Sequence, residues 1–553
     1  MKQIFYLFLL TAGVIFLLPD NTNAQYNLGI ATSNWSGTNA LYLNPANIAD
    51  SREKFTIDIF SANAGIDNNL GSFTSITGLK NAVNSGNVNN LFSYTNNATF
   101  SLLAPYAEVR LPGFMWSINH KHSIALTNSV NAMNQFNNFD QSLFRTVGDP
   151  NYVVNGNVTS LTSKNFNYTA QLWTQTGLTY AGVLLDNDEH EIKVGATLRY
   201  LHGVGYVGLK GSNLDVVYKP NNDSVHVTNS DIEFASNILN TKNAVLNGGS
   251  STGNLLSEVF NSGGGSGVGG DLGIVYDYMP EYARDKYDMD GLRDYSRNRY
   301  VLRFSASIMD IGSIAYGANN NSNAKVTGNG YITGQGLSDS VKDYESFRNY
   351  AVQHGFTADT SHQNTRVYMP TTLHLAVDYN VYRNFYLNAT YISNLANRQD
   401  FGNSYYNQVT VTPRYDRQML SIGVPITYSM LTNNIKVGVG IRYSGFFVGS
   451  DDMLALIARN QEGLNVYVGG FVPFYKLGPK HRSNIPDSTA PEPDMEHGGS
   501  VDTSDNCPDM PLLTTPVHSN TGKKAADVAP GNNNAAILKG NNGEIIVDER
   551  EAE

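Results

Sequence analysis

The chain of 553 residues contains one cysteine, Cys507, which can neither form a disulfide within the chain nor complete a zinc site with cysteine partners. Charged residues make up 15% of the chain, against roughly 25% in soluble domains. The net charge is −11, and the sequence has no basic stripe that would neutralise phosphates. These shortages give no support to a redox role or to a nucleic-acid partner.

Long apolar runs are also missing, apart from one at the N-terminus. Lys2 precedes an apolar run from Ile4 to Leu18, and a short polar stretch then leads to Ala24. A positive start, a short apolar run and a small residue at the cleavage point are features of a secretory signal peptide. The run is shorter than the roughly 20 residues that span a bilayer. We therefore expect residues 1–24 to be removed, and Gln25 excludes lipoprotein attachment.

Tyrosine and glycine, by contrast, are abundant, with 33 and 51 residues, and the mature chain alternates between apolar and polar residues. In one stretch Ile192, Val194, Ala196, Leu198 and Tyr200 alternate with Lys193, Gly195, Thr197 and Arg199. Side chains in a strand point alternately to the two faces of a sheet. One face of this strand is therefore apolar, and the other is charged or small.

The same alternation predicts strands along most of the mature chain. It recurs at residues 55–66, 107–119, 123–131, 166–200, 272–278, 302–308, 373–379, 385–391, 420–428, 435–443 and 464–475. A soluble β-sandwich also alternates, but its strands are typically about 5–6 residues long. We therefore predict an all-β fold in which residues 54–475 form a transmembrane antiparallel β-barrel of about 12–14 strands, in contact with outer-membrane lipid.

The segments between and after the strands differ in character. Long polar loops suit the extracellular side of a barrel, because periplasmic turns are short. Within these loops, the sequence predicts a hairpin over 214–228 and a helix over 338–352. Residues 476–553 contain eight prolines, seven basic and 13 acidic residues. This segment cannot bury enough apolar area to offset its ordering entropy. We expect a disordered, acidic tail, which an even-stranded barrel with a periplasmic N-terminus would leave in the periplasm.

A local signature precedes the first expected strand. Gly29–Asn34 leads into Ala40–Asp50, which contains Asn44-Pro45-Ala46. This segment resembles the Asn-Pro-Ala hatch of FadL-like fatty-acid transporters and of PorV/PorQ-like barrels. The mature chain to Tyr475 more closely resembles an uncharacterised Bacteroidota outer-membrane family with a domain of unknown function. Further stretches that carry this resemblance are 271–276, 307–312, 369–374 and 449–452.

The resemblance implies that residues 25–53 form a plug inside the barrel, with Asn44, Pro45 and Ala46 as its gate. The residue types are compatible, since proline fixes φ and asparagine bonds nearby backbone groups. An ordinary turn before the first strand is the other interpretation of the segment. Seven charged or ionisable residues on polar strand faces are candidates for lining the lumen: Lys193, Arg199, Arg303, His374, Asp378, Lys436 and Arg442. They can pair with one another or form a substrate path.

Other motifs carry little chemistry. Asp288-Met289-Asp290-Gly291 resembles half of a calcium loop, but Lys286 and Arg297 stand where such a loop needs acidic residues. His120 and His122 lie in a turn, and the glycine run 263–267 lacks a following lysine. We expect no metal site, no cofactor and no enzymatic activity, although a triad assembled in space leaves no sequence signature.

Three functions remain open from the sequence. The first is a FadL-like channel for small hydrophobic or amphipathic compounds, gated by the plug. The second is a PorV-like barrel that anchors or shuttles a periplasmic or exported protein through its tail or loops. The third is a hydrolase at the extracellular rim. Of these, we favour the channel.

Overall fold

The structure is a computed structural model, and it describes the chain from Tyr26 to Lys476 with interruptions. The interruptions are residues 70, 74–91, 95–100, 142–159, 188, 220–223, 238–263, 281–287, 290–291, 294, 296–297, 318–321, 334–335, 337–339, 341–343, 361–363 and 455–462. The expected signal peptide lies outside the described residues, as do the expected tail after Lys476 and most of the half calcium loop.

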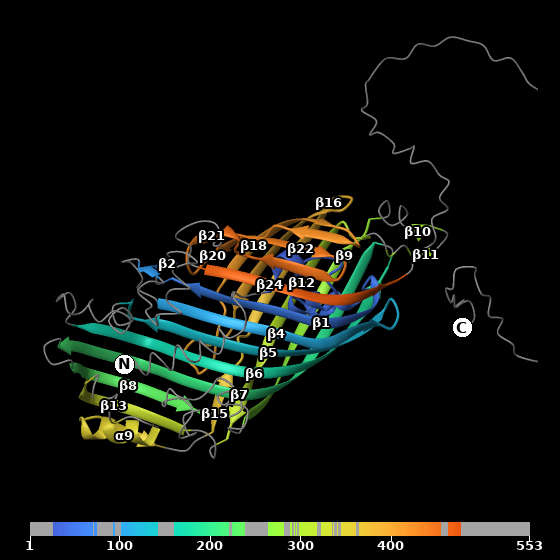
Figure 1. Cartoon of the computed structure of the whole chain (residues 1–553). Helices are drawn as coiled ribbons and strands as arrows, with labels where there is room; N and C mark the ends of the chain where they lie inside the picture. Colours follow the sequence, from blue (N-terminus) through green and yellow to red (C-terminus); the bar gives the residue numbers. More distant parts are fainter. Residues whose placement is uncertain are drawn as a thin grey trace, which may run out of the picture. The chain divides into compact units, whose positions relative to one another are not determined.

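One sheet closes on itself to form the barrel (Figure 1). In order around the barrel, its strands are β1 (Glu53–Asn68), β4 (Ser101–Ser117), β5 (His122–Phe139), β6 (Leu161–Asp186), β7 (His190–Lys219), β9 (Gly265–Tyr278), β12 (Leu302–Tyr316), β16 (Thr372–Tyr382), β17 (Phe385–Asn394), β18 (Gln408–Asp416), β19 (Leu420–Gly423), β20 (Ile426–Ser429), β21 (Asn434–Val437), β22 (Val439–Tyr443), β23 (Phe446–Ser450) and β24 (Gly463–Tyr475). Every neighbouring pair is antiparallel, and β24 pairs with β1 to close the ring. With β19 and β20 as one interrupted strand, and β21 and β22 as another, the barrel has 14 strands.

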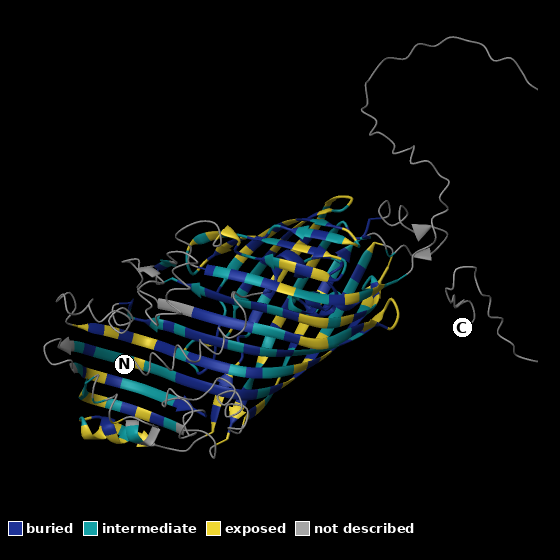
Figure 2. Cartoon of the chain, in the orientation of Figure 1, coloured by how far each residue is buried: buried dark blue, intermediate teal, exposed yellow. Residues whose placement is uncertain are grey.

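The alternation in the sequence becomes the inside and the outside of the barrel. Leu198 and Leu272 are 64% and 57% exposed on the outer surface, whereas Lys193 and Arg199 are buried. Figure 2 shows buried and exposed positions following one another along the strands. An apolar outer surface and a polar interior are the pattern of a barrel that spans lipid. The prediction of a transmembrane antiparallel barrel of 12–14 strands is confirmed.

Two strands that the sequence predicts as continuous are interrupted. The expected strand 420–428 breaks before Pro425, which has no N–H to donate to a ladder. The expected strand 435–443 breaks at Gly438, where a Cβ atom would overlap the carbonyl oxygen of Ser450. The amide of Gly438 donates to the carbonyl of Pro425 at 2.8 Å, so the two breaks face each other.

The end of the barrel with the long loops carries an extension of the sheet. Beyond Gly203, β7 leaves β9 and pairs with β8 (Ser224–Ser236), which pairs with β13 (Ser322–Thr333). The remaining elements at this end are β14 (Thr357–Thr360), β15 (Thr365–Tyr368), α9 (Tyr344–Gln353) and the short pair β2 (Gly71–Phe73) and β3 (Phe92–Tyr94), while β10 (Asp288–Met289) pairs with β11 (Leu292–Arg293) between β9 and β12. The hairpin predicted over 214–228 is present as the paired ends of β7 and β8, and of the helix predicted over 338–352 the structure describes α9 at Tyr344–Gln353. Among the described residues, no helix is long and apolar enough to cross a bilayer.

Candidate functional site

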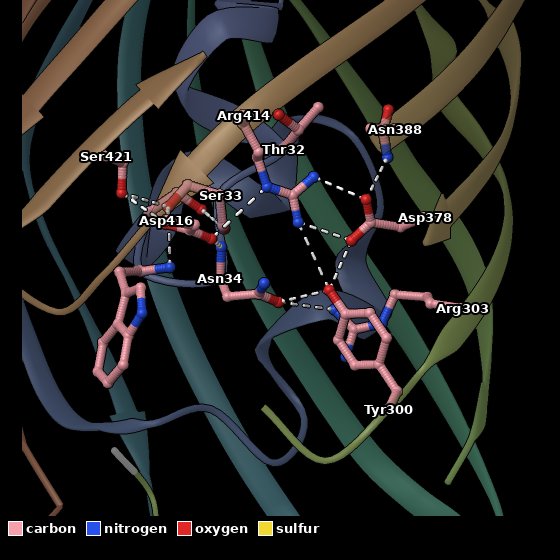
Figure 3. Close-up of polar contacts among 12 residues, drawn as sticks. Thr32, Ser33, Asn34, Tyr300, Arg303, Asp378, Asn388, Arg414, Asp416 and Ser421 are labelled. Carbon is pink, nitrogen blue, oxygen red and sulfur yellow. Dashed lines mark hydrogen bonds and ion pairs between the residues drawn. The ribbon is translucent and has the colours of Figure 1, made fainter. Parts of the chain in front are cut away.

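Residues 26–50, here called the inner segment, lie inside the barrel, and Figure 3 shows part of this segment among the strands. The segment contains three short helical turns: α2 (Leu28–Ala31), η1 (Gly37–Tyr42) and η2 (Pro45–Ile48). Local chemistry explains η2, because Asn44 accepts a hydrogen bond from the amide of Ala46 at 2.8 Å and Pro45 is the first helical residue. Asn44, Pro45 and Ala46 are all buried.

The side chain of Asn44 ties the inner segment to the barrel wall. Its Nδ2 atom donates to the carbonyl of Ile274 at 3.1 Å and to the carbonyl of Ala306 at 3.0 Å. These carbonyls belong to β9 and β12, and the two residues face each other in the ladder. Each such bond stabilises the docked segment by about 1 kcal/mol.

The wall beneath Asn44 is flat because two glycines face inward there. Gly195 of β7 lies opposite Gly273 of β9 in the ladder. A Cβ atom at Gly195 would overlap the backbone of Ala46, and one at Gly273 would overlap the carboxamide of Asn44. Glycine is the residue that permits this close approach of two backbones.

Two further side chains hold the segment to this side of the barrel. The carbonyl oxygen of Leu43 lies 2.6 Å from the hydroxyl of Ser307, which donates to it, and 3.0 Å from Nδ1 of His374. The Nε2 atom of His374 lies 3.0 Å from the hydroxyl of Thr372. His374, one of the residues that the sequence places in the lumen, thus contacts the inner segment directly.

The opposite wall has a second close contact, at α2. A Cβ atom at Gly29 would lie 2.8 Å from the backbone nitrogen of Gly440, and one at Gly423 would overlap the carbonyl of Gly29. Asp451, which follows β23, accepts the amides of Leu28 at 3.0 Å and Gly29 at 3.2 Å. Burial raises the pKa of Asp451 to about 6, although these two amide bonds act to lower it. The segment is therefore clamped between two walls.

Asp416 forms a third anchor (Figure 3). Its carboxylate accepts the hydroxyl of Ser33 and the amide of Asn34, each at 2.7 Å. The side-chain oxygen of Asn34 in turn lies 2.8 Å from the hydroxyl oxygen of Tyr300. Because one partner of each Asp416 bond is charged, these bonds are stronger than those between neutral groups.

The charged residues of the lumen pair with one another. Arg414 binds both oxygens of Asp378, at 2.7 and 2.6 Å, and Tyr300 donates to Asp378 at 2.5 Å. Asp277 accepts two hydrogen bonds from Arg303, at 2.6 and 2.8 Å, and forms an ion pair with Lys193 at 2.9 Å. Because these buried charges are paired with one another, they do not leave a free charge that could bind a ligand.

The other expected lumen residues also have partners. Arg199 reaches Asp271 at 2.6 Å and Asp310 at 2.5 Å, and Lys436 pairs with Asp67. Arg442 is fully buried and donates to the carbonyls of Arg417, Gln418 and Ser444 and to the hydroxyl of Ser421. Arg414, Asp416 and Tyr300 were not among the sequence candidates, because nothing in their local pattern shows that the inner segment reaches them.

A second element enters the lumen from the long-loop end. Residues 395–407, here called the inner loop, connect β17 to β18 and reach β5 and β6 across the barrel. The amide group of Gln135 accepts the backbone N–H of Ser404 at 2.7 Å and donates to its carbonyl at 2.6 Å. The hydroxyl of Tyr406 donates to Asn137 at 2.5 Å. In the sequence, the aromatic residues of this loop are its one indication of a place inside the barrel.

The two inner elements meet and enclose a chamber. The rings of Tyr26 and Tyr405 lie 5.4 Å apart. Between the inner segment, the inner loop and the wall lies an empty volume of about 640 Å³. A larger cavity of about 1170 Å³ lies on the other side of the inner segment, and its lining includes the ion-paired Lys193, Asp277 and Arg303. The inner segment thus separates a cavity toward the short-turn end of the lumen from the chamber beside the inner loop.

Residues 45–451 match the model of a family described as a family of unknown function (DUF5723). No curated protein matches the chain. Among solved structures, the Ralstonia pickettii toluene transporter TbuX is similar at 10% identity and TM-score 0.36, over 80% of this chain and 95% of that one. The P. putida toluene transporter TodX is similar at 8% identity and TM-score 0.37, over 80% of this chain and 95% of that one. A Pseudomonas aeruginosa FadL homologue is similar at 10% identity and TM-score 0.24, over 82% of this chain and 100% of that one.

Proposed function

The chain belongs to the DUF5723 family of unknown function, and we propose that it is an outer-membrane channel, not an enzyme, for small hydrophobic or amphipathic compounds. In this structure the channel is closed by the inner segment and the inner loop. The inner segment serves as the gate, with Asn44, Pro45 and Ala46 at its contact with the wall.

The observation that carries the proposal is how the inner segment is attached. The segment is described throughout and contributes no strand to the barrel. Its contacts are hydrogen bonds from a few side chains, close packing against glycines such as Gly273, and burial of apolar side chains such as Ile30 against the wall. The segment can therefore leave the wall without breaking any ladder of the barrel. Each neutral bond lost costs about 1 kcal/mol, and each bond to Asp416 or Asp451 costs about 1.5–3 kcal/mol.

The chamber supports the choice of compound. Its lining combines the rings of Tyr26, Tyr42 and Trp173 with polar groups such as Asn131 and Gln175. Apolar and aromatic walls with a few polar groups are typical of small-molecule sites. An amphipathic compound matches both parts of this surface.

A disulfide that locks the inner segment tests the proposal. The hydroxyls of Ser33 and Ser421 lie 3.1 Å apart, so cysteines at both positions are close enough to be bridged. In a Cys507→Ser background, Ser33→Cys with Ser421→Cys should stop the swelling of proteoliposomes in L-arabinose when oxidised, and reduction should restore it. The matched control is Ser117→Cys with Ser123→Cys, whose hydroxyls are also 3.1 Å apart but link β4 to β5 within the wall.

This control disulfide should leave swelling unchanged in both redox states. Equal swelling of the oxidised and reduced Ser33–Ser421 pair would contradict the gate. A complete lack of swelling in every variant, including the reduced ones, would contradict a passive channel for solutes of this size.

One feature favours a second candidate, an anchor for a protein partner. The extension formed by β8, β13 and α9 continues the sheet beyond β9 and has its own apolar cluster, which includes Val227, Val326 and Ala351. A sheet of this kind is a firm platform on which another protein can dock. Co-purification of one stoichiometric protein, lost when β8 (Ser224–Ser236) and β13 (Ser322–Thr333) are shortened and the barrel strands are left intact, is the result that would favour the anchor.

A further inference from the structure

The chamber has an aromatic lining that the closure of the lumen does not itself require. Five rings line it, from Tyr26 and Tyr42 of the inner segment, Tyr106 and Trp173 of the wall and Tyr405 of the inner loop. Three methionines, Met133, Met309 and Met369, complete the apolar part of the lining. Flat rings and adaptable thioethers together favour a flat, apolar body as the occupant.

Two buried N–H groups at the chamber have no hydrogen-bond partner among the described residues. They are Nε1 of Trp173 and Nε of Arg110. Trp173 is 5% exposed and Arg110 is 8% exposed. A buried donor without an acceptor is costly, and buried indole N–H groups usually find one. Both residues line the chamber. The occupant should therefore bring a hydrogen-bond acceptor.

The charges around the chamber are already balanced. Arg110 pairs with Glu108 at 2.9 Å, and Arg199 pairs with Asp310 at 2.5 Å. An additional anion or cation would enter without a free counter-charge and would lose its hydration, which costs several kcal/mol or more. A neutral occupant avoids that cost.

The wall is also distorted at the chamber. The register of β12 against β9 shifts between Ile308 and Ile311, and Asp310 has a φ of +55°. This bulge lets both Met309 and Asp310 line the chamber, although they are adjacent in one strand. Bulges of this kind re-aim side chains and are common beside functional sites.

From these observations we propose that the chamber binds a small neutral aromatic molecule with a carbonyl or hydroxyl oxygen. This oxygen accepts a hydrogen bond from Nε1–H of Trp173. The inference deepens the proposed function, on which it rests, by naming the class of compound that the channel holds between its two closures.

Acetophenone and α-methylstyrene test the proposal because they have nearly the same shape but only the first has a carbonyl. Titration calorimetry of the full-length chain in detergent, with matched micelles in cell and syringe, should give saturable binding of acetophenone. Trp173→Phe keeps a ring but removes the donor, and it should weaken acetophenone about tenfold, as the loss of one hydrogen bond does. The same change should leave α-methylstyrene unaffected.

Trp116→Phe is the matched control, since Trp116 is 44% exposed on β4 and does not line the chamber. It should change neither affinity. The proposal is overturned if acetophenone shows no saturable binding, if Trp173→Phe leaves its affinity unchanged, or if α-methylstyrene binds wild type as tightly as acetophenone does. If one of these binding results occurs and the Ser33–Ser421 disulfide still stops swelling, the proposed ligand of the chamber is overturned and the channel is not. Binding that depends on Trp173, with no effect of the lock, overturns the channel alone.

Discussion

Replacing Asn44 with alanine should expose the chamber about 100-fold more often than in the wild type. The change removes the bonds from Asn44 to the carbonyls of Ile274 and Ala306 and the cap on Ala46. Three neutral hydrogen bonds are worth about 3 kcal/mol, and each 1.4 kcal/mol is about a tenfold change in the ratio of open to closed states. Met309→Cys in a Cys507→Ser background reports the exposure, because Met309 is buried and lines the chamber.

The measured quantity is the rate at which a charged thiol reagent modifies Cys at position 309, which follows the open population when closing is fast. Gly273→Val acts on the same contact from the wall, since its Cβ overlaps Asn44, and should give a rate similar to that of Asn44→Ala. Gly317→Val is the control, because a Cβ atom there meets nothing within 4 Å. Unchanged modification rates in both Asn44→Ala and Gly273→Val would show that this contact does not hold the segment.

The second large effect is expected at Asp378. Asp378 is 4% exposed. Arg414, which donates to both carboxylate oxygens of Asp378, is also 4% exposed. Asp378→Ala leaves the guanidinium of Arg414 buried, with Asp416 at 3.5 Å as its remaining carboxylate partner among the described residues. Breaking a buried pair in this way costs about 3–5 kcal/mol of the free energy of unfolding. Urea titration of the chain folded in lipid vesicles measures this loss.

Two controls separate the buried charge from general damage. The double change Asp378→Leu with Arg414→Met removes both charges and should be less destabilising than Asp378→Ala alone. Glu233→Ala breaks the half-exposed pair with Lys210, with side-chain exposures of 33% and 26%, and should cost no more than about 1 kcal/mol. If the double variant is as unstable as Asp378→Ala, the buried charge is not the cause.

The strands could be predicted because their signal is local. A period of two places the last strand at 464–475, and the structure has β24 at Gly463–Tyr475. The same period places Lys193 and Arg199 inside, but it does not reveal Asp277 or Asp271 as their partners. The interruptions at Pro425 and Gly438 were missed although proline and glycine are the residues that mark them.

The inner elements were harder to derive because their contacts join distant parts of the chain. The amide of Asn34 meets Asp416, 382 residues later, and Gln135 meets Ser404, 269 residues later. No periodic pattern encodes such contacts. The position of Asn44 inside the lumen followed from a resemblance, whereas the inner loop had no such guide. A cluster of aromatic residues in a polar loop, here Phe401, Tyr405 and Tyr406, is the signal that was available.

The central claim is that the inner segment and the inner loop close a channel that is otherwise open. Single-channel recording in planar bilayers tests it with two variants. Asn44→Ala loosens the segment, and Gln135→Ala removes the three hydrogen bonds between Gln135 and Ser404 of the loop. We expect wild type to open only rarely, each single variant to open briefly but more often, and the double variant to carry a sustained current. A double variant that remains as closed as wild type would contradict the account and leave a plugged barrel with another purpose.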